Sequence, residues 1–179
     1  MIYKSEDIEK DTVLAVAKGM ATAARTAPKG CGNDKIVTLI VDGKEKDAIT
    51  AEMRKIAESP DAGPFLRDGG NVDNSECVVL IGVRNVPLGL SGCGICGFET
   101  CAEMSKAGAN CAFNITDLGI AVGSAVSLAA DNRIDNRIMY TAGKAAVRIG
   151  LLPEDVRVCY AVPLSARGKS VYYDRGGEI

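Results

Sequence analysis

The sequence predicts a three-layer α+β domain in which helices cover both faces of a sheet. Helix and strand patterns follow one another as α-β-α-β, then a cysteine-rich loop, then α-α-α-β, which is not the regular alternation of a doubly wound parallel sheet. The 179 residues suffice for one well-filled core, whereas two separate cores would be small. No repeat, low-complexity tract or linker divides the chain, so we expect a single domain over residues 1–179.

The first part of the chain predicts two helices and a strand. Residues 5–26 have an acidic first turn and apolar residues recurring on one face, and Pro28 prevents the helix from continuing. The apolar run 35–41 predicts a buried strand, and residues 45–58 predict the second helix. Residues 59–75, rich in Pro, Gly, Asp and Asn, predict a loop.

The rest of the chain is mostly helical around two further strands. The predicted elements are a buried strand at 76–83, a short helix at 99–108, a short extended piece at 111–114, helices at 117–132 and 135–150, and a strand at 156–164. The helix at 117–132 consists of unusually small residues, which favour close packing of a neighbour.

Composition excludes several classes of function. The net charge of −2, the absence of Trp and an aromatic content of only 4% argue against nucleic-acid binding. The absence of His removes imidazole ligands and His-based catalytic dyads or triads. No uninterrupted apolar run approaches the length of a membrane span, and the charged first residues contain no signal-peptide core. We therefore expect a cytoplasmic protein.

The segment 91–114 carries the pattern that points to chemistry. Cys93, Cys96, Cys101 and Cys111 follow the spacing C-x2-C-x4-C-x9-C, with glycines between the first three. Iron–sulfur cubanes bind through four thiolates, and glycines let a loop curl around them. We predict a [4Fe–4S] cluster on these four residues. A zinc site with four cysteine ligands, a redox dithiol and plain buried cysteines are the alternatives.

The fourth ligand is less determined than the first three. Cys111 completes the set by its position, but Cys31, Cys77 or a thiol of a partner chain would satisfy the same chemistry. Cys77 and Cys159 lie in apolar strand patterns, where a cysteine usually acts as a small hydrophobic residue.

The cysteine segment resembles a known cluster-binding sequence. CGICGFETCAEM, beginning at Cys93, is similar to the four-iron segment C-G-x-C-G-x-x-x-C of corrinoid iron–sulfur proteins and of a membrane-associated electron-transport subunit. In those proteins the fourth cysteine lies farther downstream than Cys111 does here.

The whole chain resembles a prokaryotic family described as ferredoxin-domain-containing proteins, for which no reaction is established. The segments that carry this resemblance are ARTAPKG (24–30), CGICGFETC (93–101), DLGIAVGSAVSLAADNRIDNRIMYTAGKAA (117–146) and GKSVYYDR (168–175).

A further resemblance connects the chain to the nitroreductase-like flavoproteins. TAPKGCGN (26–33) is similar to their early loop, and AAVRIGLLPEDVRVCYAVPL (145–164) to their late helix and terminal strand. The resemblance implies a helix-flanked, mainly antiparallel sheet, here with an inserted cysteine-rich loop, and a homodimer with flavin mononucleotide (FMN) at its interface. Cations and amides that could hold such a flavin are Arg25, Lys29, Asn33 and Lys169. The alternative for the cations is a solvated helix end or surface charge.

These observations predict a [4Fe–4S] electron-transfer or redox protein on a nitroreductase-like scaffold. Its substrate stays open, and its partner would be a redox protein or a small molecule. Two other functions remain open: an FMN-dependent oxidoreductase with an accessory cluster, and a non-catalytic structural or regulatory metal protein. No carboxylate pair or activated serine is evident, and the sequence does not identify catalytic residues.

Overall fold

A four-stranded antiparallel sheet forms the middle layer of the computed structural model, which describes residues 1–61 and 63–173. The strands are β1 (Ile36–Val41), β2 (Cys77–Arg84), β3 (Asp135–Asn136) and β4 (Val156–Ser165), in the order β1-β2-β4-β3. All pairs of neighbouring strands in this sheet are antiparallel, which confirms the predicted α+β class.

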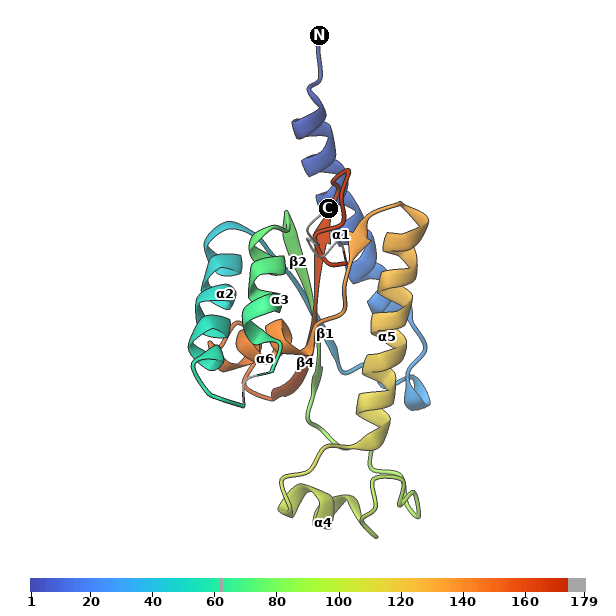
Figure 1. The fold of residues 1–179 in the computed structure, drawn as a ribbon. Coiled ribbons are helices and arrows are strands. Elements are labelled where there is room, and N and C mark those ends of the chain that lie inside the picture. Colours follow the sequence, from blue (N-terminus) through green and yellow to red (C-terminus); the bar gives the residue numbers. More distant parts are fainter. Residues whose placement is uncertain (62, 174–179) are drawn as a thin grey trace.

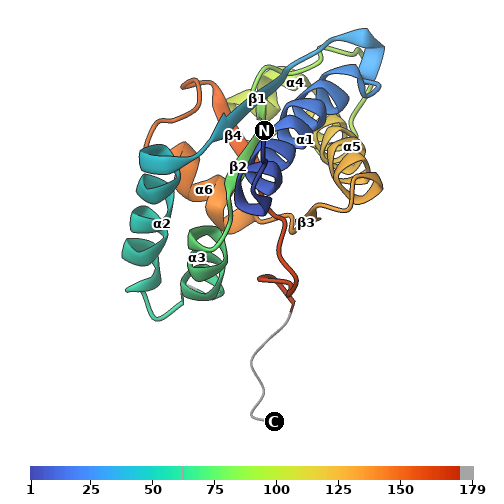
Figure 2. The ribbon, with the colours of Figure 1, turned by 90° about the horizontal axis from the view of Figure 1, so that it is seen from above.

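Helices cover both faces of the sheet. They are α1 (Ser5–Thr26), α2 (Gly43–Ala57), α3 (Phe65–Asp73), α4 (Cys101–Lys106), α5 (Ala112–Asp131) and α6 (Tyr140–Arg148), with a 3-10 turn, η1 (Gly30–Gly32). The helices α1 and α5 lie on one face, and α2, α3 and α6 lie on the other (Figures 1 and 2). The predicted three layers are therefore present.

Side chains of the central strand β2 point alternately into two hydrophobic cores, one on each face of the sheet. Val79 and Ile81 of β2 pack with α1 and α5, whereas Val78 and Leu80 pack with α2, α3 and α6. All four side chains are fully buried. Successive residues of a strand point to opposite faces, so this continuous apolar run supplies both cores at once.

On the second face, α6 approaches β4 very closely. A Cβ atom on Gly143 would lie 2.0 Å from the carbonyl oxygen of Cys159. Only glycine permits this approach, because any side chain would push the helix off the strand.

Three predicted segments differ from the structure. Residues 65–73, predicted as loop, form α3, because Phe65 and Val72 are buried in the second core. The predicted extended piece at 111–114 is wrong because α5 already begins at Ala112. The predicted helix at 135–150 is also wrong at its start, since Asp135 pairs with the end of β4 and α6 begins only at Tyr140.

The helix α5 is a core helix, although its composition alone would allow a membrane span. Over 18 residues its mean hydropathy is 1.4, and among the described residues it alone meets the length and apolarity of a span. Its Leu118, Ala121 and Ala125 are fully buried in the core shared with α1. The hydroxyl of Ser124 donates a hydrogen bond to the carbonyl of Ala23 in α1, at 3.1 Å.

The cysteine segment lies outside both cores. The chain leaves the sheet at the end of β2, passes through the loop and α4, and returns into α5, so that α4 projects beyond one end of the sheet (Figure 1). Neither core includes a buried residue from 85–117. The scaffold and the candidate metal centre are therefore separate in packing.

Candidate metal centre

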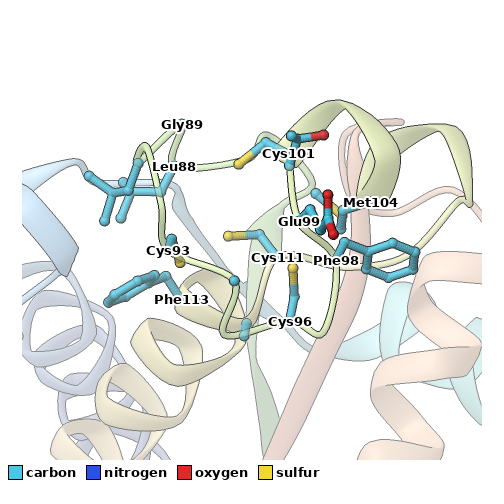
Figure 3. A pocket seen from close by; sticks show the side chains of 14 residues that line it. Leu88, Gly89, Cys93, Cys96, Phe98, Glu99, Cys101, Met104, Cys111 and Phe113 are labelled. Carbon is cyan, nitrogen blue, oxygen red and sulfur yellow. The ribbon is translucent and has the colours of Figure 1, made fainter.

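Four cysteines surround one cavity where the cysteine segment meets α5. Cys93, Cys96 and Cys101 follow β2, and Cys111 lies directly before α5. All four line the same cavity, with their sulfurs around a common space (Figure 3). The structure thus brings together the four residues that the sequence predicts as cluster ligands.

Glycines shape the loop that carries the first two cysteines. Gly92, Gly94 and Gly97 have φ angles of 68°, 58° and 86°, a region that other residues seldom enter. The N–H of Gly97 donates to the carbonyl of Gly94 at 2.9 Å, which closes a tight turn around Cys96. The glycine pattern therefore has the conformational role that the sequence suggests.

A capped helix positions the third cysteine. The hydroxyl of Thr100 accepts from the N–H of Glu103, and the Glu103 carboxylate accepts from the N–H of Thr100, which fixes the start of α4 at Cys101. Apolar side chains close the cavity around the sulfurs: Leu88, Phe98, Met104 and Phe113. Such a lining limits access of water to a cluster and helps to set its reduction potential.

Cys111 differs from the other three because it begins a long helix. Burial acts to raise the pKa of its thiol, but the backbone N–H groups of Leu88, Asn114 and Phe113 and the charge of Lys35 favour the thiolate. The net result is a pKa below its ordinary value. The surroundings of this sulfur therefore favour the thiolate, which is the form that binds metals.

Two buried polar residues stand beside Cys111, and neither is evident from the cysteine pattern. Asn114 is 2% exposed, and its side-chain amide donates to the carbonyls of Arg84 (3.2 Å) and Val86 (2.8 Å). Its Oδ1 accepts from the ammonium of Lys35 at 3.5 Å. The sequence marks this network only by two polar residues: Lys35 in the apolar run 35–41, and Asn114 soon after Cys111.

The cysteine sulfurs are not gathered as tightly as a single bound metal ion would require. Among the described residues, no three Cys, Asp or Glu side chains come close enough to hold one ion. Zinc would draw its sulfurs to within about 4 Å of each other, because Zn–S bonds are about 2.3 Å long. The cavity measures about 20 Å³, roughly the space of one water. A cubane would need more room than this cavity offers.

Cys77 and Cys159 lie in the sheet, whereas Cys31 follows Gly30, where an added Cβ atom would lie 3.1 Å from Leu88 and 3.4 Å from Phe113 of the cavity lining. Cys31 is exposed in η1 with φ 53°, and Cys159 is buried in β4. Cys77 is buried at the start of β2, seven residue steps and roughly 23 Å from the end that leads into the cysteine segment. Among the described residues, Cys111 lines the cavity and Cys31 and Cys77 do not, which favours Cys111 as the fourth ligand.

Arg25 and Lys29, which the sequence suggests for flavin binding, already form contacts near the C-terminal end of α1. Arg25 pairs with Asp34 and donates to the carbonyl of Ile36 at 2.8 Å. The ammonium of Lys29 donates to the carbonyls of Ala24 (2.8 Å) and Arg25, which satisfies the C-terminal end of the helix.

The four flavin candidates do not form one pocket within a chain. Asn33 is exposed next to η1, which lies at the start of α5 through a hydrogen bond from Gly30 to Asp117 (2.9 Å). Lys169 comes shortly after β4, and the last residue of β4 pairs with β3. The strand β3 follows the C-terminal end of α5, so Lys169 comes near the opposite end of α5 from Asn33. The 20 residues of α5 span about 30 Å. Their joint role in binding a flavin stays a prediction.

A basic groove borders the cysteine segment. It measures about 470 Å³ and lies between α6 and β4, and its cationic side chains are Lys144, Arg148 and Arg157. The guanidinium of Arg157 donates to the carbonyl of Gly108, just after α4, at 3.2 Å. Sequence reasoning missed this groove because its residues come together only when α6 packs on β4.

Comparison with known proteins assigns the family. Residues 107–175 match the family described as uncharacterized proteins containing a ferredoxin domain. An uncharacterized protein of Archaeoglobus fulgidus is 44% identical over 183 residues, which cover 98% of each chain. The chain belongs to this family. The matched region of the family includes Cys111 but begins after the other three candidate ligands, so the cluster assignment depends on the geometry above.

Solved structures assign the scaffold. A nitroreductase with bound FMN from Desulfitobacterium hafniense superposes with a TM-score of 0.60 at 16% identity, covering 95% of this chain and 81% of that one. An FMN-dependent nitroreductase from Clostridium difficile gives 0.54 at 16% identity, covering 97% and 83%. At such low identity these likenesses show the fold, and the predicted nitroreductase-like scaffold is confirmed.

Proposed function

We propose that the protein is a redox protein that binds one [4Fe–4S] cluster through Cys93, Cys96, Cys101 and Cys111 and transfers electrons. The convergence of these four side chains on one apolar cavity is the observation that carries the proposal. Membership of a ferredoxin-domain family supports redox chemistry. When bound, the cluster would supply one-electron chemistry. The chain's own contribution is to hold the thiolates, exclude water and present the site to a redox protein or small molecule.

A flavin-dependent function is the second candidate. It is favoured by the scaffold, since structural relatives of this fold are described as binding FMN. If the protein binds a flavin, Arg25, Lys29, Asn33 and Lys169 would contribute to the site from the two chains of a homodimer. A single chain does not bring these four residues together. A homodimer and a cytoplasmic location both stay predictions.

Anaerobic purification with metal and flavin analysis tests the proposal. The protein should absorb broadly near ~400 nm and contain about four iron atoms per chain. Cys96→Ala should lose most of the iron, because removal of one of the four thiolates destabilises a cubane, whereas Cys159→Ala should keep it. Equal iron content in the two variants would contradict the assignment of ligands. Stoichiometric zinc without iron would favour a structural metal site, and extracted FMN would favour the flavin function.

A further inference from the structure

Lys35 is a buried cation without an anionic partner. The residue is only 8% exposed, and no carboxylate among the described residues forms an ion pair with it. Among the described residues, the ammonium group forms one hydrogen bond, the 3.5 Å contact to Oδ1 of Asn114. Lysine is almost never buried unless it is paired, because removing an ammonium from water is costly. The position therefore calls for a negative charge that no carboxylate of the described residues provides.

The surrounding hydrogen bonds hold Lys35 at the root of the cysteine segment. Its backbone carbonyl accepts from the N–H of Arg84, the last residue of β2, at 3.0 Å. Both polar ends of Asn114 are assigned, because its amide donates to two carbonyls and only Oδ1 remains for the ammonium. The amide thus joins Lys35 to the first turn of α5, three residues after Cys111.

We propose that Lys35 is the buried counter-charge of the iron–sulfur cluster, positioned by Asn114. The inference rests on the proposed function. A cubane with four thiolate ligands is a net anion, and reduction by one electron adds a further negative charge. A fixed cation in a poorly solvated site stabilises the reduced form more than the oxidised form, and so raises the reduction potential. It also stabilises cluster binding as a whole.

The test uses the anaerobic protein and three variants. Lys35→Gln removes the charge but keeps a hydrogen-bond donor, Lys35→Arg keeps the charge, and Lys106→Gln removes a charge from exposed α4 as the matched control. Iron and sulfide content are measured first, and the midpoint potential is then measured by dithionite titration monitored by electron paramagnetic resonance. We expect Lys35→Gln to shift the midpoint to more negative values, Lys35→Arg to stay near wild type, and the control to change little, because solvent screens its charge.

The other possible results of this experiment each support or contradict the role of Lys35. An unchanged midpoint in Lys35→Gln at wild-type iron content overturns the inference. If Lys35→Gln loses its iron, retention in Lys35→Arg supports the counter-charge, and loss in both contradicts it. In cluster-free protein, Lys35→Gln should not lower the melting temperature, whereas an equal loss of stability with and without iron would make Lys35 merely structural. Absence of iron from the wild-type protein would instead refute the proposed function itself.

Discussion

Individual cysteines of this chain occupy two kinds of environment. Desolvation is the main cause that raises the pKa of the Cys77 thiol to about 12, and burial likewise raises that of Cys159 to about 12. The pKa of Cys111 is instead lowered from its ordinary value. Protonated, buried thiols are inert, whereas a thiolate can bind iron. The environment therefore separates Cys77 and Cys159, which act as packing residues, from the proposed ligand Cys111.

The two raised pKa values predict a loss of stability at alkaline pH. Above about pH 9 the thiols of the unfolded chain release protons that the folded chain retains, so the free energy of unfolding falls as pH rises toward 12. Each thiol contributes a slope of about 1.4 kcal/mol per pH unit. Urea unfolding of the cluster-free protein between about pH 8 and pH 10 measures the slope. Cys77→Ala or Cys159→Ala should each reduce it, and a slope that neither variant changes would rule out these thiols as its source.

Residue by residue, the sequence predicts the local part of the site better than the remote part. Cys93, Cys96 and Cys101 lie within nine positions, so their spacing alone brings them to one loop. Lys35 and Asn114 are 79 positions apart and meet only because β1, β2 and α5 pack together. Proximity of that kind has no periodic or spacing signal in a single sequence.

Among the elements, the contact of α6 with β4 depends on one missing side chain. Gly143→Ala should lower the free energy of unfolding by about 3 kcal/mol, because the new Cβ would overlap the backbone of Cys159. Gly119→Ala in α5 is the matched control, since no atom lies within 4 Å of the Cβ position there. Helix propensity should make that control neutral or stabilising by about 1 kcal/mol. Urea denaturation compares the two, and similar destabilisation of both would refute the steric explanation.

Elements with strong patterns were predictable, and those held by tertiary contacts were not. The apolar strands β1, β2 and β4 and the long α1 were found within one or two residues of their bounds. By contrast, α3 contains Gly69 and Gly70, which disfavour a helix, and it is stabilised by burial and by a 2.7 Å hydrogen bond from Thr141 to Asp68. The pairing of β3 likewise depends on β4, about 30 residues later in the chain.

At the scale of the whole molecule, the scaffold should be insensitive to loss of the metal. Removing the cluster by chelation should increase amide hydrogen exchange in residues 86–111, because this segment contributes no buried residue to either core. Exchange in the central strands β2 and β4 should stay slow. Mass spectrometry of the loaded and cluster-free protein measures both regions. Faster exchange throughout the central strands would contradict the separation of site and scaffold.

The same separation sets an order of events during synthesis. Both cores form without a buried residue of 86–111, so we expect the chain to reach its final topology without iron. If the proposed function holds, iron and sulfide would then be added to a chain that is already folded. In a cell short of iron, the cluster-free protein would then stay folded and would not be lost to degradation.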